Sequence, residues 1–262
     1  MRLDQYLEQH LFCETRNKAQ QLIRANKVLV NGKIVNSKGY EVKAGDEVSL
    51  VESDVLKFVS RAGHKLEKAI DEFQLSFQDK VICDIGSSTG GFTDCALQHG
   101  AKKVYAIDVG SSQLHDSLRG NPKIIVRENT NFRNVTMADF SEPIDIYVCD
   151  VSFISAREIL KTLFSFHQLF RIILLFKPQF EVGPGKLNDR GVVSQTDDLV
   201  ESLCNFQAFL EERGMKISHV TYSPILGSKE GNIEFLFDIS SAGAPFSWNP
   251  SQLVRKALKA LR

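Results

Sequence analysis

Four charged residues stand beside or within apolar segments, where a charge calls for an explanation. Asp150 ends the segment YVCD, Lys177 follows ILLF, Lys65 lies in SRAGHKL and Glu234 lies in GNIEFLF. A lysine whose pKa is lowered by burial and by a second lysine can deprotonate a hydroxyl group or stabilise an alkoxide, and carboxylates can orient such lysines. As a set, the four residues indicate proton transfer at a hydroxyl. Any one of them alone can be a paired or snorkelling charge, which is the interpretation we favour for Lys65 by itself.

A glycine-containing loop, DIGSSTGGF over residues 84–92, follows an apolar segment. Gly86 permits a sharp turn at the end of a strand, and Gly90 and Gly91 let the backbone approach a ligand at a helix N-terminus. Asp108 lies 22 residues beyond Gly86, where an acid can accept hydrogen bonds from ribose hydroxyls. The loop reads GxxxGG rather than GxGxxG, which favours a nucleoside-sized ligand over a pyrophosphate. The alternative is a structural turn followed by an incidental aspartate.

The segments around these residues alternate between strand-like and helical patterns, which predicts a doubly wound α/β sheet. In such a sheet, groups at the carboxyl ends of central strands converge on the ligand crevice; Asp150 and Lys177 satisfy this rule directly, whereas Lys65 and Glu234 need the fold to bring them in. The predicted strands are Val81–Ile85, Lys103–Ile107, Lys123–Val126, Ile144–Cys149 and Arg171–Phe176, with two late strands near 216–224 and 233–239. The predicted helices are 65–73, 90–98, 112–118, 155–166 and 197–213.

The first fifty residues predict a separate small α+β unit. Leu3, Tyr6 and Leu7 recur at helical spacing, and a second helix follows Thr15 as its N-cap. A strand at 28–30, the turn signal Asn31-Gly32 and a strand at 47–51 complete the unit. We expect domains at 1–56 and 64–262, joined by a linker at 57–63.

The charge is balanced overall but unevenly distributed. Residues 1–43 carry a net charge of +4, residues 239–262 carry another +4, and the total is zero, so the middle is acidic. Two basic ends on an acidic body are typical of a protein that holds a polyanion at its periphery. A basic helix beside a hairpin suits the phosphate backbone of structured RNA, although an ordinary solvated helix face gives the same pattern. The candidate RNA-binding residues are Arg2, Arg16, Lys18, Arg24, Lys27, Lys33 and Arg61.

Composition excludes several classes. Apolar residues make up 43% and charged residues 24% of the chain, as in globular proteins rather than disordered or fibrous ones. The longest apolar run, 172–176, is too short to span a bilayer, and the N-terminus lacks a signal-peptide pattern. The five cysteines form no CxxC pair, which indicates free thiols in a reducing cytoplasm, and no metal site is predicted.

Four blocks of the small unit, RLDQYL, TRNKAQQLI, VLVNGKIV and VKAGDEV, resemble the S-four RNA-binding domain of a ribosomal small-subunit protein, pseudouridine synthases and tyrosyl-tRNA synthetases. The blocks SRAGHKL, STGGF, DVSFIS, KPQFEVG and GNIEF resemble the TlyA family of ribosomal RNA methyltransferases, some of which are named haemolysins. The order Lys-Asp-Lys-Glu is similar to the tetrad of FtsJ-type ribose 2′-O-methyltransferases. The chain is thus identified as a member of a family with a class I methyltransferase sheet.

This resemblance implies S-adenosylmethionine as cofactor and 2′-O-methylation of a cytidine in ribosomal RNA. The sequence does not predict which ribosomal RNA is modified, or whether the substrate is free RNA, a ribosomal subunit or the assembled ribosome. It implies Lys177 as proton acceptor, Asp150 as its orienting partner, and Lys65 and Glu234 as support. The implied cofactor residues are Asp84, Gly86, Ser87, Ser88, Thr89, Gly90, Gly91, Phe92, Asp108, Val109 and Glu128, with the adenine edge near 128–131.

Three alternatives stay open. The chain could be a non-catalytic RNA-binding or ribosome-assembly factor that keeps a cofactor pocket, and the intact tetrad argues against this. It could be a membrane-active haemolysin, for which the short basic C-terminal segment offers little support. Base methylation is the chemical alternative, but the Asn-Pro-type motif it usually needs after the fourth strand is absent from DVSF. The sequence does not predict the oligomeric state.

Overall fold

The computed structural model describes residues 1–261 except Leu11, Glu14, Ala25, Lys38, 51–56, 228–230 and 243–245. The chain divides into two compact units, Met1–Lys57 and Phe58–Arg262, with Arg262 itself and the other residues just named outside the description. Within the described residues, no helix is long and apolar enough to cross a membrane.

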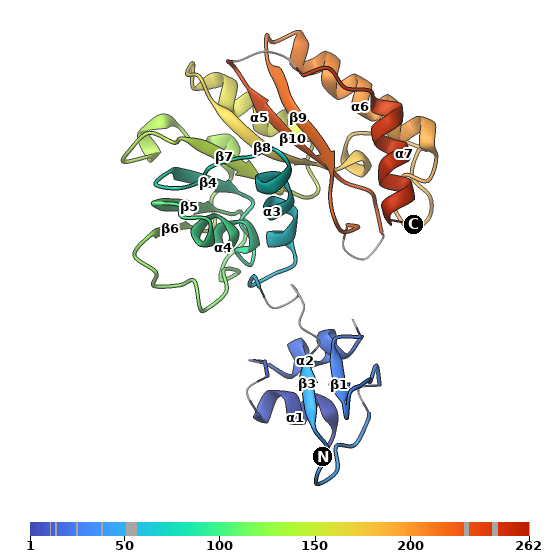
Figure 1. Ribbon diagram of the computed structural model, residues 1–262. Coiled ribbons are helices and arrows are strands. Elements are labelled where there is room, and N and C mark those ends of the chain that lie inside the picture. The colour runs from blue at the N-terminus through green and yellow to red at the C-terminus, as the bar shows by residue number, and fades with distance from the viewer. Residues whose placement is uncertain are drawn as a thin grey trace. The chain divides into compact units, whose positions relative to one another are not determined.

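The small unit packs two helices against a three-stranded antiparallel sheet (Figure 1). Helices α1 (Leu3–Gln9) and α2 (Arg16–Arg24) bury their apolar faces, while strands β1 (Val28–Val30), β2 (Lys33–Ile34) and β3 (Val48–Leu50) pair in the order β2-β1-β3. The predicted hairpin turn has positive φ at both Asn31 (50°) and Gly32 (75°), as the tight hairpin turn requires. Thr15 caps α2 through its hydroxyl, which accepts from the Lys18 amide.

The large unit contains a seven-stranded sheet in the order β6-β5-β4-β7-β8-β10-β9. Strands β4 (Val81–Ile85), β5 (Lys103–Ile107), β6 (Ile124–Arg127), β7 (Ile146–Cys149) and β8 (Arg171–Phe176) are parallel. Strand β10 (Phe235–Ser240) runs antiparallel to both β8 and β9 (Lys216–Tyr222). The predicted doubly wound sheet is confirmed, with an antiparallel pair at one edge.

Helices cover both faces of this sheet. Apolar residues of α3 (Ala62–Glu72) and α4 (Gly91–Gln98) join one hydrophobic core, and those of α5 (Ala156–Ser165), α6 (Thr196–Glu211) and α7 (Pro250–Leu261) join the other. Neighbouring strand residues alternate between the two cores, so Ile82 faces one and Cys83 the other. Short 3₁₀ helices at η2 (Phe132–Asn134), η3 (Met137–Asp139) and η4 (Pro178–Phe180) complete the connections.

Apart from small shifts at the ends of elements, the structure differs from the sequence-based expectations at three places. Residues 112–118 form turns rather than a helix, because Ser112 has a positive φ of 53°, and the Glu128 carboxylate accepts the hydrogen bonds of the amides of 112–114. The segment expected as a linker contributes Phe58, which is 2% exposed, to the core of the large unit, and α3 begins at Ala62. Glu234 lies just before β10 rather than inside it. The basic C-terminal helix α7 packs onto the large unit through Leu253, Val254 and Ala257.

Candidate active site

The four charged residues that the sequence singled out meet in one place. Lys65 Nζ lies 2.6 Å from Glu234 Oε2 and 3.9 Å from Asp150 Oδ2. Lys177 Nζ lies 2.6 Å from Asp150 Oδ1 and donates to Ser152 Oγ at 2.8 Å. The result is a chain of alternating charges, Glu234–Lys65–Asp150–Lys177, in which Asp150 bridges the two lysines.

Sheet topology explains how the residues come together. Asp150 follows β7 and Lys177 follows β8, and these two strands are parallel neighbours, so their carboxyl ends lie at the same edge. Strand β10 pairs antiparallel with β8, and Phe235 stands opposite Phe176. Glu234, one residue before Phe235, is therefore brought beside Lys177, one residue after Phe176. Helix α3, which packs on one face of the sheet, contributes Lys65, the neighbour of the core residue Leu66.

The charges shift each other's pKa. Burial acts to raise the pKa of Asp150, but the ammonium groups of Lys65 and Lys177 outweigh it and hold this pKa below its ordinary value. Burial acts to lower the pKa of Lys177, but Asp150 and Glu234 outweigh it and raise this pKa. The sequence-based expectation that burial lowers the pKa of the base is therefore wrong for the ligand-free chain. With its pKa raised, Lys177 is an ammonium ion at neutral pH in the ligand-free chain.

The glycine loop turns tightly between β4 and α4. Gly86 has φ 81°, and a Cβ there would lie 2.9 Å from the Asp150 carbonyl oxygen, so the loop packs directly against the end of β7. Gly90 has φ 93° and precedes the first residue of α4. A side chain at Gly86 would thus displace the strand end that carries Asp150.

Two carboxylates hold this region in shape. The Asp108 carboxylate accepts from the amides of Ser88 (2.8 Å) and Gly110 (2.7 Å), which ties the glycine loop to the loop after β5. Asp84 is fully buried, accepts from the Thr93 hydroxyl at 2.6 Å, and has a second oxygen, Oδ1, without a hydrogen-bond partner among the described residues. Burial raises the pKa of Asp84 to about 7.

A cavity of about 630 Å³ lies over the tetrad and the glycine loop. Its lining includes the whole tetrad, Arg61, and six of the eleven expected cofactor residues: Gly86, Ser87, Ser88, Thr89, Gly91 and Phe92. Asp84, Gly90, Asp108, Val109 and Glu128 do not line this cavity.

Glu128 holds a neighbouring loop through hydrogen bonds to its carboxylate. Its carboxylate accepts from the amides of Leu114, Ser112 and Gln113 and from Arg119, and these bonds lower its pKa to about 2. The residue thereby fixes the loop at 112–114.

The cavity also has lining residues that the sequence analysis missed. Ser152 and Gln179 follow the same strand ends as Asp150 and Lys177, so the strand-end rule could have found them. Arg190 and Asn232 lie far along the chain, with no local signal. The Asn232 side chain accepts from the Val193 amide and donates to the Gly191 carbonyl. These two bonds connect the segment after Arg190 to the segment before β10.

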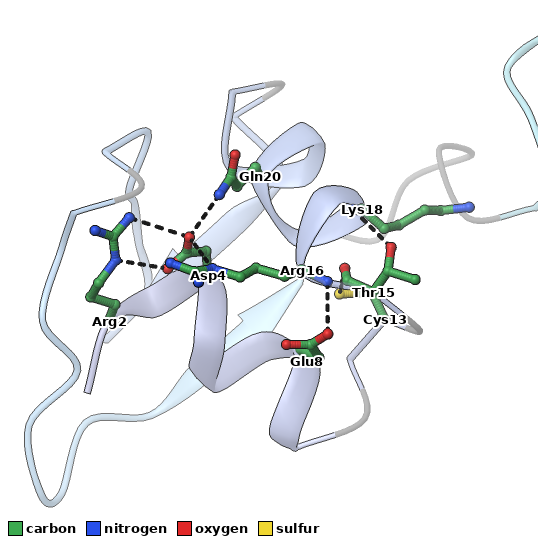
Figure 2. Close-up of polar contacts among 8 residues, drawn as sticks. All are labelled: Arg2, Asp4, Glu8, Cys13, Thr15, Arg16, Lys18 and Gln20. Atoms are coloured by element: carbon green, nitrogen blue, oxygen red, sulfur yellow. Dashed lines mark hydrogen bonds and ion pairs between the residues drawn. The ribbon is translucent and has the colours of Figure 1, made fainter.

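The candidate RNA-binding residues fall into two groups. Arg61 precedes α3 and lines the cavity of the large unit. The others belong to the small unit, where Arg2 and Arg16 share the buried carboxylate of Asp4 (Figure 2). Lys33 and Arg24 are exposed, and Lys18 and Lys27 are half-buried.

Comparison with known proteins identifies both units of the chain. The FtsJ-like methyltransferase model matches residues 58–238, and the S4 domain model matches residues 1–48. Hemolysin A of Brachyspira hyodysenteriae is 43% identical over 90% of this chain and 98% of its own length. The 23S rRNA (cytidine-2′-O)-methyltransferase TlyA of Campylobacter jejuni is 37% identical over 90% of this chain and 98% of its own length.

A solved structure of a protein named as a hemolysin from Streptococcus thermophilus covers 99% of this chain and 96% of its own, with 36% identity and a TM-score of 0.77. The small and large units thus both have counterparts in the same relatives. The chain belongs to the FtsJ-like methyltransferase family, within the group of its members that carry an S4 domain before the methyltransferase domain.

Proposed function

We propose that the protein transfers a methyl group from S-adenosylmethionine to the ribose 2′-hydroxyl of a cytidine in ribosomal RNA. The observation that carries the proposal is the ion-paired chain of Lys65, Glu234, Asp150 and Lys177 in a cavity beside the glycine loop. The Campylobacter jejuni relative is named for this reaction on 23S rRNA.

The residues present fit the cofactor. Residues 86–89 and Gly91 of the glycine loop line the cavity, and the buried Asp84 Oδ1, next to this loop, has no hydrogen-bond partner among the described residues. Each carboxylate oxygen can accept about two hydrogen bonds, so Asp108 can hold Ser88 and Gly110 and still accept from ribose hydroxyls. S-adenosylmethionine supplies a methyl group on a positively charged sulfur, which leaves as a neutral thioether.

Lys177 is the residue we assign to the hydroxyl proton. Positive charge in the cavity counteracts the effect of Asp150 and Glu234, so Lys177 loses its proton to solvent more readily there than in the ligand-free chain. The neutral amine then takes the proton of the 2′-hydroxyl as the O–CH₃ bond forms and the S–CH₃ bond breaks. Asp150 orients Lys177, and Lys65 with Glu234 keeps Asp150 in place.

We assign RNA binding to residues 1–56 and catalysis to residues 64–262. The basic residues of the small unit and Arg61 bind RNA phosphates in this proposal, and the S4 domain match supports it. Since ribosomal RNA is the substrate, we also infer a cytoplasmic location.

Methyl transfer from labelled S-adenosylmethionine to purified ribosomal subunits, followed by nucleoside analysis, tests the proposal. We expect label in 2′-O-methylcytidine, lost in Lys177→Ala and retained in the control Lys161→Ala, whose side chain on α5 is exposed. Absence of label on both subunits, with cofactor binding intact, would refute it in favour of a non-catalytic RNA-binding role.

The name of the Brachyspira relative supports a second candidate function, membrane lysis. Release of a dye from phospholipid vesicles without cofactor tests it. We expect no release, and release by both wild-type and Lys177→Ala protein would establish lysis as an activity independent of the tetrad.

A further inference from the structure

The small unit buries the carboxylate of Asp4, which is not part of its hydrophobic core. Asp4, the second residue of α1, is 0% exposed. It accepts from Arg2 Nε (3.1 Å) and Nη2 (3.3 Å), from Arg16 Nε (2.9 Å) and from Gln20 Nε2 (2.8 Å). Figure 2 shows the three donors reaching Asp4 from three sides.

The Asp4 carboxylate is ionised at neutral pH. Burial acts to raise the pKa of Asp4, but the hydrogen bonds from Arg2, Gln20 and Arg16 outweigh it and hold this pKa well below its ordinary value. A buried ionic cluster of this kind is a poor source of stability, since an apolar group of similar size often serves as well. Leu3 and Leu7 on the same helix already provide apolar contacts to the core.

The arginines differ from Asp4 in being open to solvent. The side chains of Arg2 and Arg16 are 42% and 44% exposed. Arg16 donates to Asp4 through its Nε alone. Its two terminal nitrogens have no hydrogen-bond partner among the described residues. A guanidinium held at Nε keeps its outer N–H groups in a fixed plane, the arrangement that binds a phosphate through two parallel hydrogen bonds.

We propose that Asp4 is a positioning residue that holds the guanidinium groups of Arg2 and Arg16 ready to bind RNA phosphates. The inference rests on the proposed RNA-binding role of the small unit. Because the side chains are already ordered, binding does not have to restrict their rotamers. Asp4 itself touches no RNA in this account.

Charge and positioning predict opposite results when Asp4 is neutralised. Asp4→Asn raises the net charge by one, so a pure charge effect strengthens RNA binding. If Asp4 positions the arginines, the same change weakens binding. Glu8→Gln is the matched control: Glu8 lies on the same helix, and the substitution changes the charge equally. Within the described part of the chain Glu8 accepts only from the Arg16 backbone amide, a bond that glutamine can keep.

The experiment measures the affinity of the full chain for refolded, protein-free ribosomal RNA at several KCl concentrations. For Asp4→Asn we expect affinity lower by roughly three- to tenfold for each arginine that no longer binds its phosphate, and a salt dependence shallower by about one phosphate per arginine released. Glu8→Gln should bind as tightly as wild type or more tightly. If Asp4→Asn binds as tightly as Glu8→Gln, the inference is overturned.

Thermal unfolding and circular dichroism establish whether Asp4→Asn folds. If it does not, Arg16→Lys decides, because the single ammonium nitrogen of lysine pairs with the Asp4 carboxylate and cannot also present a planar fork outward. We expect a shallower salt dependence for Arg16→Lys, and wild-type affinity and salt dependence would overturn the inference.

A third readout separates this inference from the proposed function. Asp4→Asn should raise the KM for RNA while kcat and cofactor affinity stay unchanged, because the tetrad lies in the other unit. Failure of the proposed function removes methyl transfer in the wild type as well, but leaves the RNA affinities of the variants to be compared.

Discussion

Asp150 lies between Lys177 and Lys65, 2.6 Å from the first and 3.9 Å from the second, so one carboxylate bridges the two ammonium groups. Asp150 also abuts the glycine loop through its backbone carbonyl, which a Cβ at Gly86 would approach to 2.9 Å. The site for the acceptor hydroxyl and the loop proposed for the cofactor are therefore mechanically connected.

The rate of methyl transfer should rise with pH through the alkaline range. The carboxylates raise the pKa of Lys177, and only its neutral form accepts a proton. Asp150→Asn removes the nearest negative charge and so lowers this pKa, which moves the rising limb of the pH–rate profile to lower pH. Single-turnover rates at a series of pH values measure this, and an unmoved limb in Asp150→Asn would contradict the assignment of Lys177.

Loss of Lys177 should lower kcat far more than it alters cofactor binding. A positioned general base contributes roughly 10²- to 10⁴-fold to a rate. We expect a fall of this size for Lys177→Met, measured with saturating RNA and cofactor. Lys161→Met, on the surface of α5, is the control. Equal rates for the two variants would exclude Lys177 from the chemistry.

Glu234→Gln should destabilise the large unit. Lys65 is 7% exposed, and its closest partner is Glu234, so the substitution leaves a buried ammonium with one carboxylate 3.9 Å away. Breaking a buried pair costs about 3–5 kcal/mol. Chemical denaturation followed by circular dichroism measures the loss, and Glu158→Gln, in an exposed pair with Lys161, should lose little.

Gly86→Ala should cost more stability than Gly120→Ala. Both glycines have nearly the same φ, 81° and 82°, so both variants carry similar backbone strain. Only at Gly86 does the added methyl meet a backbone atom, whereas nothing lies within 4 Å of a Cβ at Gly120. The difference in unfolding free energy measures the steric cost of placing a methyl group against Asp150, and equal losses would show that this cost is absent.

Asp84 should make the ligand-free chain less stable as pH rises from about 4 to about 7. Its pKa is raised from 3.8 to about 7 by burial, so the folded state holds a proton that the unfolded state releases. Each pKa unit corresponds to about 1.4 kcal/mol, so the loss amounts to a few kcal/mol across this interval. Asp84→Asn should remove this slope from the unfolding free energy measured against pH. A slope unchanged in the variant would assign it to another group.

The sequence by itself determined the sheet and the small unit. Short apolar segments bounded by turns predicted β4, β5 and β8 at their observed bounds, because buried parallel strands are apolar throughout. The same local logic gave the Asn31-Gly32 hairpin and the capped helix α2. It failed at 112–118, where Ser112 has a positive φ of 53°, a conformation that an α-helix does not contain.

For the site, the predicted parallel sheet was enough to place Asp150 and Lys177, because both follow the carboxyl end of a strand. Glu234 needed the antiparallel register of β10 on β8, and Lys65 needed the packing of α3, since neither follows from spacing along the chain. The tertiary structure alone decided the direction of the Lys177 pKa shift. Burial and opposite charge act against each other, and which prevails depends on distances of a few ångströms between residues far apart in the sequence.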